Sequence, residues 1–242
     1  TEIYTLSLHD ALPISGGFDL TANRTQPLWF TVHAPRGTVP GDYRGEIHLR
    51  ADGRPVLTLP LTVRVLPFEL PQRTRLKAIF DLRRGPGGWH GPDGDSREQR
   101  EKWLRFIAGH RLGINSIEPP PQFDYHDGKV TMDTTGFDAT ARLCFDELGM
   151  DVCYTPHFFY MFGWAYPPNR MFGLEPFTPE WTAAFRQAYQ LFSNHLRDKG
   201  WHDKFVYYIS DEPHFSHEFV VDQMKKLCAM IHEVDPEIPI YS

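Results

Sequence analysis

The stretch KFVYYISDEPH, residues 204–214, decides how the second part of the chain is built. Its aromatic and β-branched residues are typical of a strand that is buried on both faces. Pro213 cannot donate a backbone hydrogen bond, so it ends the strand ladder. Asp211 and Glu212 therefore lie at the carboxyl end of a buried strand, where α/β barrels gather their functional side chains. The alternative is that these two carboxylates only cap the next helix.

The composition is that of an ordinary globular protein, with 41% hydrophobic and 23% charged residues among 242. The net charge is −6, from 25 basic and 31 acidic residues, and no basic block is present. This balance argues against nucleic acid or an anionic membrane surface as the partner. No apolar stretch reaches the roughly 18 residues that a membrane span needs. The start of the chain shows no signal-peptide pattern, and the compartment stays open.

Cys144, Cys153 and Cys228 are too few and too scattered for a disulfide framework or a zinc site. We expect them to be small buried hydrophobic side chains. We also expect neither a metal ion nor an organic cofactor.

The first part of the chain has the pattern of an all-β domain. Residues 28–33, 44–51 and 56–65 are predicted strands, and the last two flank Asp52-Gly53, which is a hairpin turn signal. Alternate residues of the last strand form one apolar face. Short strands of this kind predict the C-terminal part of an immunoglobulin-like β-sandwich over residues 16–70.

Residues 1–15, TEIYTLSLHDALPIS, connect poorly with the rest of the chain. They resemble a translated sequencing adapter, as occurs in metagenomic fragments. We therefore expect a non-native leader and leave it out of the fold.

From residue 71 the pattern changes to strand, loop and helix, repeated. We expect strands at 76–81, 113–118, 150–155, 204–211 and 238–241, a hairpin at 124–133, and helices at 96–110, 137–148, 178–199 and 216–234. Repeated units of this kind predict parallel strands joined by crossover helices. We predict the N-terminal half of a (β/α)8 barrel over residues 71–242, an incomplete barrel of about four and a half units. A doubly wound sheet is the alternative, but the glycines after the first strand lack the phosphate-binding spacing, which also weighs against nucleotides.

Helix ends and faces are predicted from the same pattern. Trp103, Phe106 and Ile107 follow the spacing of one inward helix face. Thr178 and Ser216 are predicted to cap the third and fourth helices.

Polar residues follow four of the predicted strands at their carboxyl ends, which meet at one mouth in a barrel. They are Asp81, Glu118, Tyr154 and His157, and then Asp211, Glu212 and His214. Each could be an ordinary loop residue, because loop ends are polar in any case. Together they predict a binding site at that mouth.

The adjacency of Asp211 and Glu212 favours one kind of chemistry. Two neighbouring carboxylates repel each other, so the pair favours one protonated acid beside one ionised partner. A glycosidase with two catalytic carboxylates needs them about 5–10 Å apart, on opposite sides of the bond that breaks. Sequence neighbours are poorly placed for that arrangement. They suit a reaction in which the sugar's own 2-acetamido oxygen is the nucleophile.

Four segments carry a resemblance to a known family: GTVPGDYRGEIHLRADG at 37–53, LPLTVRVLPFELP at 59–71, LKAIFDL at 76–82 and YYISDEPH at 207–214. Residues 26–242 resemble glycoside hydrolase family 123 and related DUF4091-containing proteins. The resemblance implies a barrel with a β-sandwich, β-N-acetylgalactosaminidase activity without a cofactor, and a carbohydrate partner with terminal N-acetylhexosamine. It also implies that Glu212 is the general acid/base and that Asp211 orients the acetamido group. A periplasmic or secreted bacterial location is a further implication of the same resemblance.

The loop at 157–177 is rich in aromatic residues, of which Tyr160 and Trp164 are our candidates for stacking on a sugar ring. The alternative is that these rings only pack the loop onto the barrel. Two further functions stay open. One is a double-displacement glycosidase whose nucleophile lies on a strand outside this chain, and the other is a non-catalytic carbohydrate-binding protein. A chain with only half of a barrel could also be inactive by itself.

Overall fold

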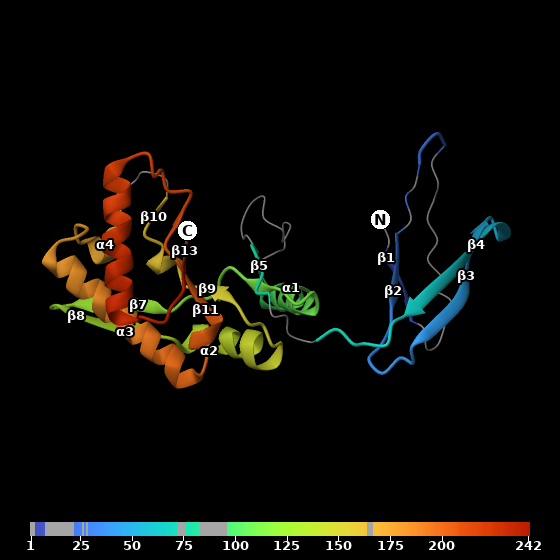
Figure 1. The fold of residues 1–242 in the computed structure, drawn as a ribbon, viewed down its shortest axis with the longest axis horizontal. Coiled ribbons are helices and arrows are strands. Elements are labelled where there is room, and N and C mark those ends of the chain that lie inside the picture. The colour runs from blue at the N-terminus through green and yellow to red at the C-terminus, as the bar shows by residue number, and fades with distance from the viewer. Residues whose placement is uncertain are drawn as a thin grey trace. The chain divides into compact units, whose positions relative to one another are not determined.

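The computed structural model describes residues 3–7, 22–25, 27, 29–71, 76–82, 96–163 and 167–242. The chain divides into two compact units, Thr1–Pro71 and Gln72–Ser242. Both units can be followed by colour along the ribbon (Figure 1).

The first unit contains two small sheets. Strands β1 (Ile3–Ser7) and β2 (Trp29–His33) pair in parallel. Strands β3 (Gly41–Ala51) and β4 (Arg54–Val65) form an antiparallel hairpin. Asp52 and Gly53 have φ angles of 49° and 75°, as a two-residue hairpin turn requires, so the turn prediction is confirmed.

Two features of this unit bear on the sequence predictions. Strand β1 lies inside residues 1–15, which the fold prediction left out. On β4, Leu61, Val63 and Val65 are half-buried, whereas Leu57 and Leu59 are 48% and 39% exposed. The described residues of this first unit form two-stranded sheets only, and the sandwich stays a prediction.

The second unit contains a parallel sheet of five short strands. They are β5 (Ile79–Phe80), β6 (Gly113–Ile114), β9 (Cys153–Tyr154), β11 (Phe205–Tyr208) and β13 (Ile240–Tyr241). Their spatial order is β13-β11-β9-β6-β5, which is the order of the chain, and every pair is parallel. The carboxyl ends of all five strands therefore lie at the same edge. Over the described residues the sheet does not close into a barrel.

Helix α1 (Arg97–Gly109) begins as predicted, because the Ser96 side chain accepts a hydrogen bond from the Gln99 amide. Its predicted inward face is wrong at Phe106, which is 57% exposed. The residues that enter the core are Leu104 and Ile107. These two lie three residues apart and share one face, whereas Phe106 is rotated away from them by the helical period.

Helix α2 (Thr135–Arg142) continues into a π-helical turn, Leu143–Glu147, and the predicted stop at Gly149 has a φ angle of 70°. Helix α3 (Pro179–Lys199) has the predicted cap, since the Thr178 hydroxyl accepts from the Trp181 amide at 3.2 Å. Its inner face supplies much of the core through buried rings at Trp181, Phe185, Tyr189 and Phe192.

Helix α4 (Glu218–Val234) begins after His217, so the predicted cap at Ser216 is wrong. The Phe215 amide bonds the Pro213 carbonyl, and the His217 amide bonds the His214 carbonyl. These two tight turns keep residues 213–217 out of the helix.

The predicted hairpin is present as β7 (Gln122–His126) and β8 (Lys129–Asp133), with Asp127 and Gly128 at positive φ. It packs on α3 through Gln187, which donates to the Gly128 carbonyl and accepts from the Val130 amide.

The described parts of the loop at 157–177, residues 157–163 and 167–177, include segments that pack at the sheet edge. They contain the short helical turns His157–Phe159 and Met171–Gly173 and the strand β10 (Phe162–Gly163). Strand β10 pairs in parallel with β12 (Ser210–Asp211), with Gly163 opposite Asp211. Aromatic residues of this loop therefore lie beside the carboxylate pair.

No helix in the described part of the chain is long and apolar enough to cross a membrane. The three cysteines are free thiols. Cys144 and Cys153 are buried, as predicted, whereas Cys228 is only partly buried.

Candidate active site

The end of the fourth sheet strand is held from both sides. The Ile209 amide donates to the Tyr241 carbonyl of β13, and the Met161 amide donates to the Ile209 carbonyl. Ser210 is fully buried and its Oγ lies 2.8 Å from the Ser242 Oγ. Asp211, the next residue, is exposed. The strand therefore delivers a carboxylate to solvent from a rigid base.

Glu212 is also exposed, and its backbone lies in the left-handed region at a φ angle of 44°. That conformation is strained for a non-glycine residue, and such residues cluster at functional sites. The left-handed residue ends the regular alternation of side chains directly after Asp211. The backbone turn that Pro213 predicts in the sequence is thus located at Glu212.

Three tyrosines form a layer at the carboxyl ends of neighbouring strands: Tyr154 on β9, Tyr208 on β11 and Tyr241 on β13. The centroid of the Tyr154 ring lies 4.5 Å from that of Tyr208 and 5.6 Å from that of Tyr241, and both pairs are stacked. The rings of Tyr208 and Tyr241 are 5.7 Å apart. We call these three residues the tyrosine layer. Because neighbouring strands bring them together, the layer forms a continuous aromatic surface next to Asp211.

The loop at 157–177 adds two more rings. Tyr160 lies 5.3 Å from Tyr208, and His157 stacks on Tyr160 at 5.0 Å. The structure therefore brings three of the predicted residues, Tyr154, His157 and Tyr160, into one cluster with Tyr208.

The electrostatics of this cluster centre on Asp211. Burial raises the pKa of Tyr208, and the charge of the nearby Asp211 raises it further. Burial also raises the pKa of Tyr160, with a second contribution from the charge of Asp211. Both phenols thus stay protonated at neutral pH and can donate hydrogen bonds near the carboxylate.

Asp81 is held at the other end of the sheet edge by Asn115. The Asn115 Nδ2 donates to the Asp81 Oδ1 at 2.8 Å, and the Asn115 Oδ1 accepts from the Leu82 amide at 3.1 Å. The pKa of Tyr154 is raised by burial, by Tyr241 and also by the charge of Asp81. Asp81 therefore lies near Tyr154, and Asp211 lies near Tyr160 and Tyr208.

Asn115, Tyr208 and Tyr241 are site residues that the sequence reasoning missed. The candidates predicted from the sequence are mainly residues that follow a strand. Tyr208 and Tyr241 are instead the last residues of strands β11 and β13. The signal that could have found them is a polar-tipped ring at the end of an apolar run, such as the pair Tyr207-Tyr208.

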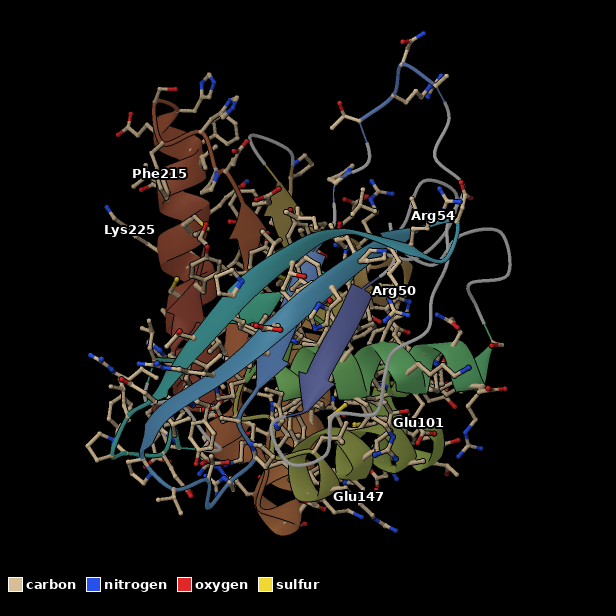
Figure 2. The ribbon with its side chains drawn as sticks, turned by 90° about the vertical axis from the view of Figure 1, so that its right-hand side faces the viewer. Arg50, Arg54, Glu101, Glu147, Phe215 and Lys225 are labelled. Carbon is tan, nitrogen blue, oxygen red and sulfur yellow. The ribbon has the colours of Figure 1, made fainter. Side chains whose placement is uncertain are left out.

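Two predicted residues have their described contacts elsewhere. The Glu118 side chain accepts from Ser116, and its carbonyl accepts from Arg100 of α1 and Thr140 of α2. His214 is exposed and stacks on His217 at 6.2 Å. Phe215, beside it, lies at the N-terminal end of α4 and is exposed (Figure 2). Trp164 lies outside the described residues.

Within the described ranges, no group of three or more His, Cys, Asp or Glu side chains could hold a metal ion. An open groove lies between β8, α3 and the end of α4, and its lining includes the ion pair Arg186–Glu233. Neither Asp211 nor Glu212 lines it.

A pair of exposed carboxylates beside a surface of tyrosine rings defines a site suited to acid–base chemistry on a carbohydrate. The family model described as "Glycoside hydrolase 123, catalytic domain" matches residues 122–242, which is half of the chain. The chain therefore belongs to glycoside hydrolase family 123, and the resemblance seen in its sequence is confirmed. It is a glycosidase, and its substrate class is carbohydrate.

The comparison with curated proteins gives no match. The matched residues include Asp211, Glu212 and the whole tyrosine layer, whereas Asp81 and Asn115 precede them.

Proposed function

We propose that the chain carries the catalytic pair of a retaining exo-glycosidase that removes β-linked N-acetylhexosamine, with N-acetylgalactosamine as the preferred sugar. The observation that carries this proposal is the adjacency of two exposed carboxylates, Asp211 and Glu212, at one strand end. Glu212 is the general acid/base. Asp211 orients the 2-acetamido group of the substrate.

The adjacency supports one mechanism over the other. A double displacement requires two carboxyl groups about 5 Å apart across the glycosidic bond. Two consecutive residues approach the sugar from the same strand end. This favours one carboxyl group that protonates the leaving group and one that orients the neighbouring acetamide. The nucleophile is then the acetamido carbonyl oxygen of the substrate.

In the first step, Glu212 donates a proton to the glycosidic oxygen as the bond from that oxygen to C1 breaks. The acetamido oxygen forms a new bond to C1, which closes an oxazolinium ring with positive charge on nitrogen. Asp211 accepts the N–H hydrogen bond and stabilises that charge.

In the second step, Glu212 takes a proton from water, and the water oxygen attacks C1 while the bond from C1 to the acetamido oxygen breaks. The configuration at C1 is retained after two inversions. Glu212 is protonated again and ready for the next cycle.

The surrounding residues supply binding. We assign sugar-hydroxyl recognition to Asp81, which Asn115 orients, and ring stacking to Tyr160. His157 supports the Tyr160 ring by stacking on it. Trp164 remains a predicted residue for stacking on the sugar ring.

The test is hydrolysis of a nitrophenyl β-N-acetylgalactosaminide by the 242-residue chain. Glu212→Gln should lower kcat/KM about 10²- to 10⁴-fold, because the proton donor is lost. Glu218→Gln is the matched control, since Glu218 is an exposed carboxylate on the first turn of α4. Wild-type rates in Glu212→Gln would show that the acid is assigned wrongly.

A thiazoline that mimics the bicyclic intermediate tests the nucleophile. Inhibition supports attack by the acetamide. A lack of inhibition, together with covalent trapping by a 2-fluoro sugar, would support a double displacement instead. Sugar binding without any turnover would identify a carbohydrate-binding protein.

A further inference from the structure

We propose that Asn169 is a positioning residue that holds Tyr160, the proposed sugar-stacking ring, in place through the main chain of Tyr160. This inference rests on the proposed function and deepens it. Asn169 acts through Tyr160 and does not itself touch the substrate.

The peptide unit that joins Tyr160 to Met161 is bonded at both of its polar groups. Its N–H group, on Met161, donates to the Ile209 carbonyl at 2.8 Å. Its carbonyl group, on Tyr160, accepts from the Asn169 Nδ2 at 2.6 Å. In a trans peptide these two groups point in opposite directions, so the two bonds together fix the tilt of the plane. One of these two bonds depends on the side chain of Asn169.

Asn169 is itself held by two main-chain bonds. Its amide donates to the Met161 carbonyl at 2.8 Å. Its carbonyl accepts from the Trp181 Nε1 at 3.1 Å, and Trp181 is 0% exposed in the first turn of α3. Asn169 therefore connects the interior of α3 to the main chain at Tyr160. Because both bonds use main-chain groups of Asn169, a change of its side chain leaves them in place.

The main chain of Tyr160 sets the place of a ring that lies close to the carboxylate pair. The ring stacks on His157 at 5.0 Å and lies 5.3 Å from Tyr208. A Cβ at Gly163 would lie 3.0 Å from the Tyr160 Oη, and Gly163 is the strand partner of Asp211. The tip of the ring thus reaches the strand pair that carries Asp211. A sugar that stacks on this ring has to reach the carboxylates at the same time, so a shift of the ring weakens binding.

The first experiment removes only the side-chain bond. Asn169→Ala should raise the KM of the nitrophenyl β-N-acetylgalactosaminide about 3- to 10-fold, as expected for loss of one hydrogen bond. The inhibition constant of free N-acetylgalactosamine should rise by the same factor. The kcat should change little, because stacking stabilises the bound substrate and the transition state alike. A fall in kcat with unchanged KM would contradict the proposal.

Asn194→Ala is the matched control for this variant. Asn194 is an exposed residue of α3, and its side-chain amide also makes a hydrogen bond, with Gln190 at 2.8 Å. Its loss should leave KM unchanged.

A second variant separates the hydrogen bond from the volume of the side chain. Asn169→Asp has the same shape, but its carboxylate cannot donate to the Tyr160 carbonyl. It should raise KM at least as much as Asn169→Ala does. A KM of Asn169→Asp equal to that of the wild type would overturn the proposal.

The third experiment asks whether Asn169 acts through the Tyr160 ring. Tyr160→Leu removes the aromatic face and keeps the carbonyl that Asn169 bonds. In this background Asn169→Ala should raise KM by less than about twofold, because the ring that it positions is gone. Any general effect of the lost bond on folding is the same in both backgrounds. Equal fold-changes in KM would therefore indicate a purely structural role and overturn the proposal. The Asn169→Asp test decides by itself if Tyr160→Leu does not fold.

The outcomes separate this inference from the proposed function. If the wild type hydrolyses the glycoside but Asn169→Ala or Tyr160→Leu has an unchanged KM, the positioning role fails and the catalytic assignment stands. If the wild type hydrolyses no N-acetylhexosaminide, the proposed function fails, and the positioning role fails with it.

Discussion

Glu212, the proposed general acid, has a backbone conformation that suits glycine better. The left-handed region costs an L-residue about 1–2 kcal/mol. Glu212 has a φ angle of 44°, and it is also the residue that is predicted to act as the acid. Local stability does not explain a glutamate at this position, whereas the proposed acid function would.

We expect Glu212→Gly to be more stable than Glu212→Ala by about 0.5–1 kcal/mol, because only glycine adopts positive φ without strain. Both variants lack the carboxyl group, so their comparison isolates the backbone. The midpoint of urea denaturation measures the difference. Equal or reversed midpoints would mean that the conformation at Glu212 carries no strain.

Among the elements, local signals were reliable where one short segment decides the outcome. The Ser96 and Thr178 caps and the Asp127-Gly128 turn are present as predicted, because each depends on a few adjacent residues. The cap at Ser216 and the inward face at Phe106 failed. At Ser216, the tight turns over residues 213–217 keep the serine outside the helix. At Phe106, the core position is taken by Leu104, which lies on the inward face.

The contact between β6 and β9 depends on a missing side chain. A Cβ at Gly113 would lie 2.0 Å from the Val152 carbonyl oxygen, so the two strands approach closely only because Gly113 has none. We expect Gly113→Ala to destabilise the chain by about 1–3 kcal/mol through overpacking. Asp81 and Asn115 lie beside this contact, so sugar binding should weaken as well.

Gly109→Ala is the control for that prediction. Gly109 ends α1, and a Cβ there meets nothing within 4 Å. It should leave stability unchanged or raise it by up to about 1 kcal/mol, because alanine favours the helix. Thermal denaturation followed by circular dichroism measures both variants. A Gly113→Ala midpoint equal to that of Gly109→Ala would contradict the close approach.

At the scale of the whole molecule, a buried charge network joins α3 to the end of α4. Asp235 is 1% exposed and accepts hydrogen bonds from Ser193, His202 and Arg197. Burial acts to raise the pKa of Asp235. The hydrogen bonds from His202 and Ser193 and the nearby charges outweigh it, and the pKa lies below the usual 3.8.

This network predicts a loss of stability in acid. A carboxylate with a lowered pKa stabilises the fold above its unfolded value of 3.8, and that contribution disappears as the pH falls through the lowered pKa. Asp235→Asn should cost about 3 kcal/mol at neutral pH, because it breaks a buried ion pair. The free energy of unfolding of Asp235→Asn should also fall less steeply with decreasing pH than that of the wild type. Urea denaturation at several pH values from about 7 to about 2 tests this, with exposed Asp198→Asn as the control. An equally steep decline in Asp235→Asn would contradict it.

We propose that the five-stranded sheet is the first part of a (β/α)8 barrel and that the β3–β4 hairpin belongs to a β-sandwich. The support for the barrel is that the strand order in space follows the order in the chain, with a helix after each of the first four strands. A doubly wound sheet would reverse direction at a switch point. The support for the sandwich is the apolar face of β4.

The sequence by itself determined where the carboxylate pair lies, at the end of an apolar strand cut by Pro213, together with the alternation of strands and helices and most turns and caps. These features depend on periodicity and on backbone preferences of neighbouring residues. Only the tertiary structure decided which side chains meet that pair. Tyr154, Tyr208 and Tyr241 lie far apart in the chain and form one layer because parallel strands align their carboxyl ends. Asn115 reaches Asp81 for the same reason.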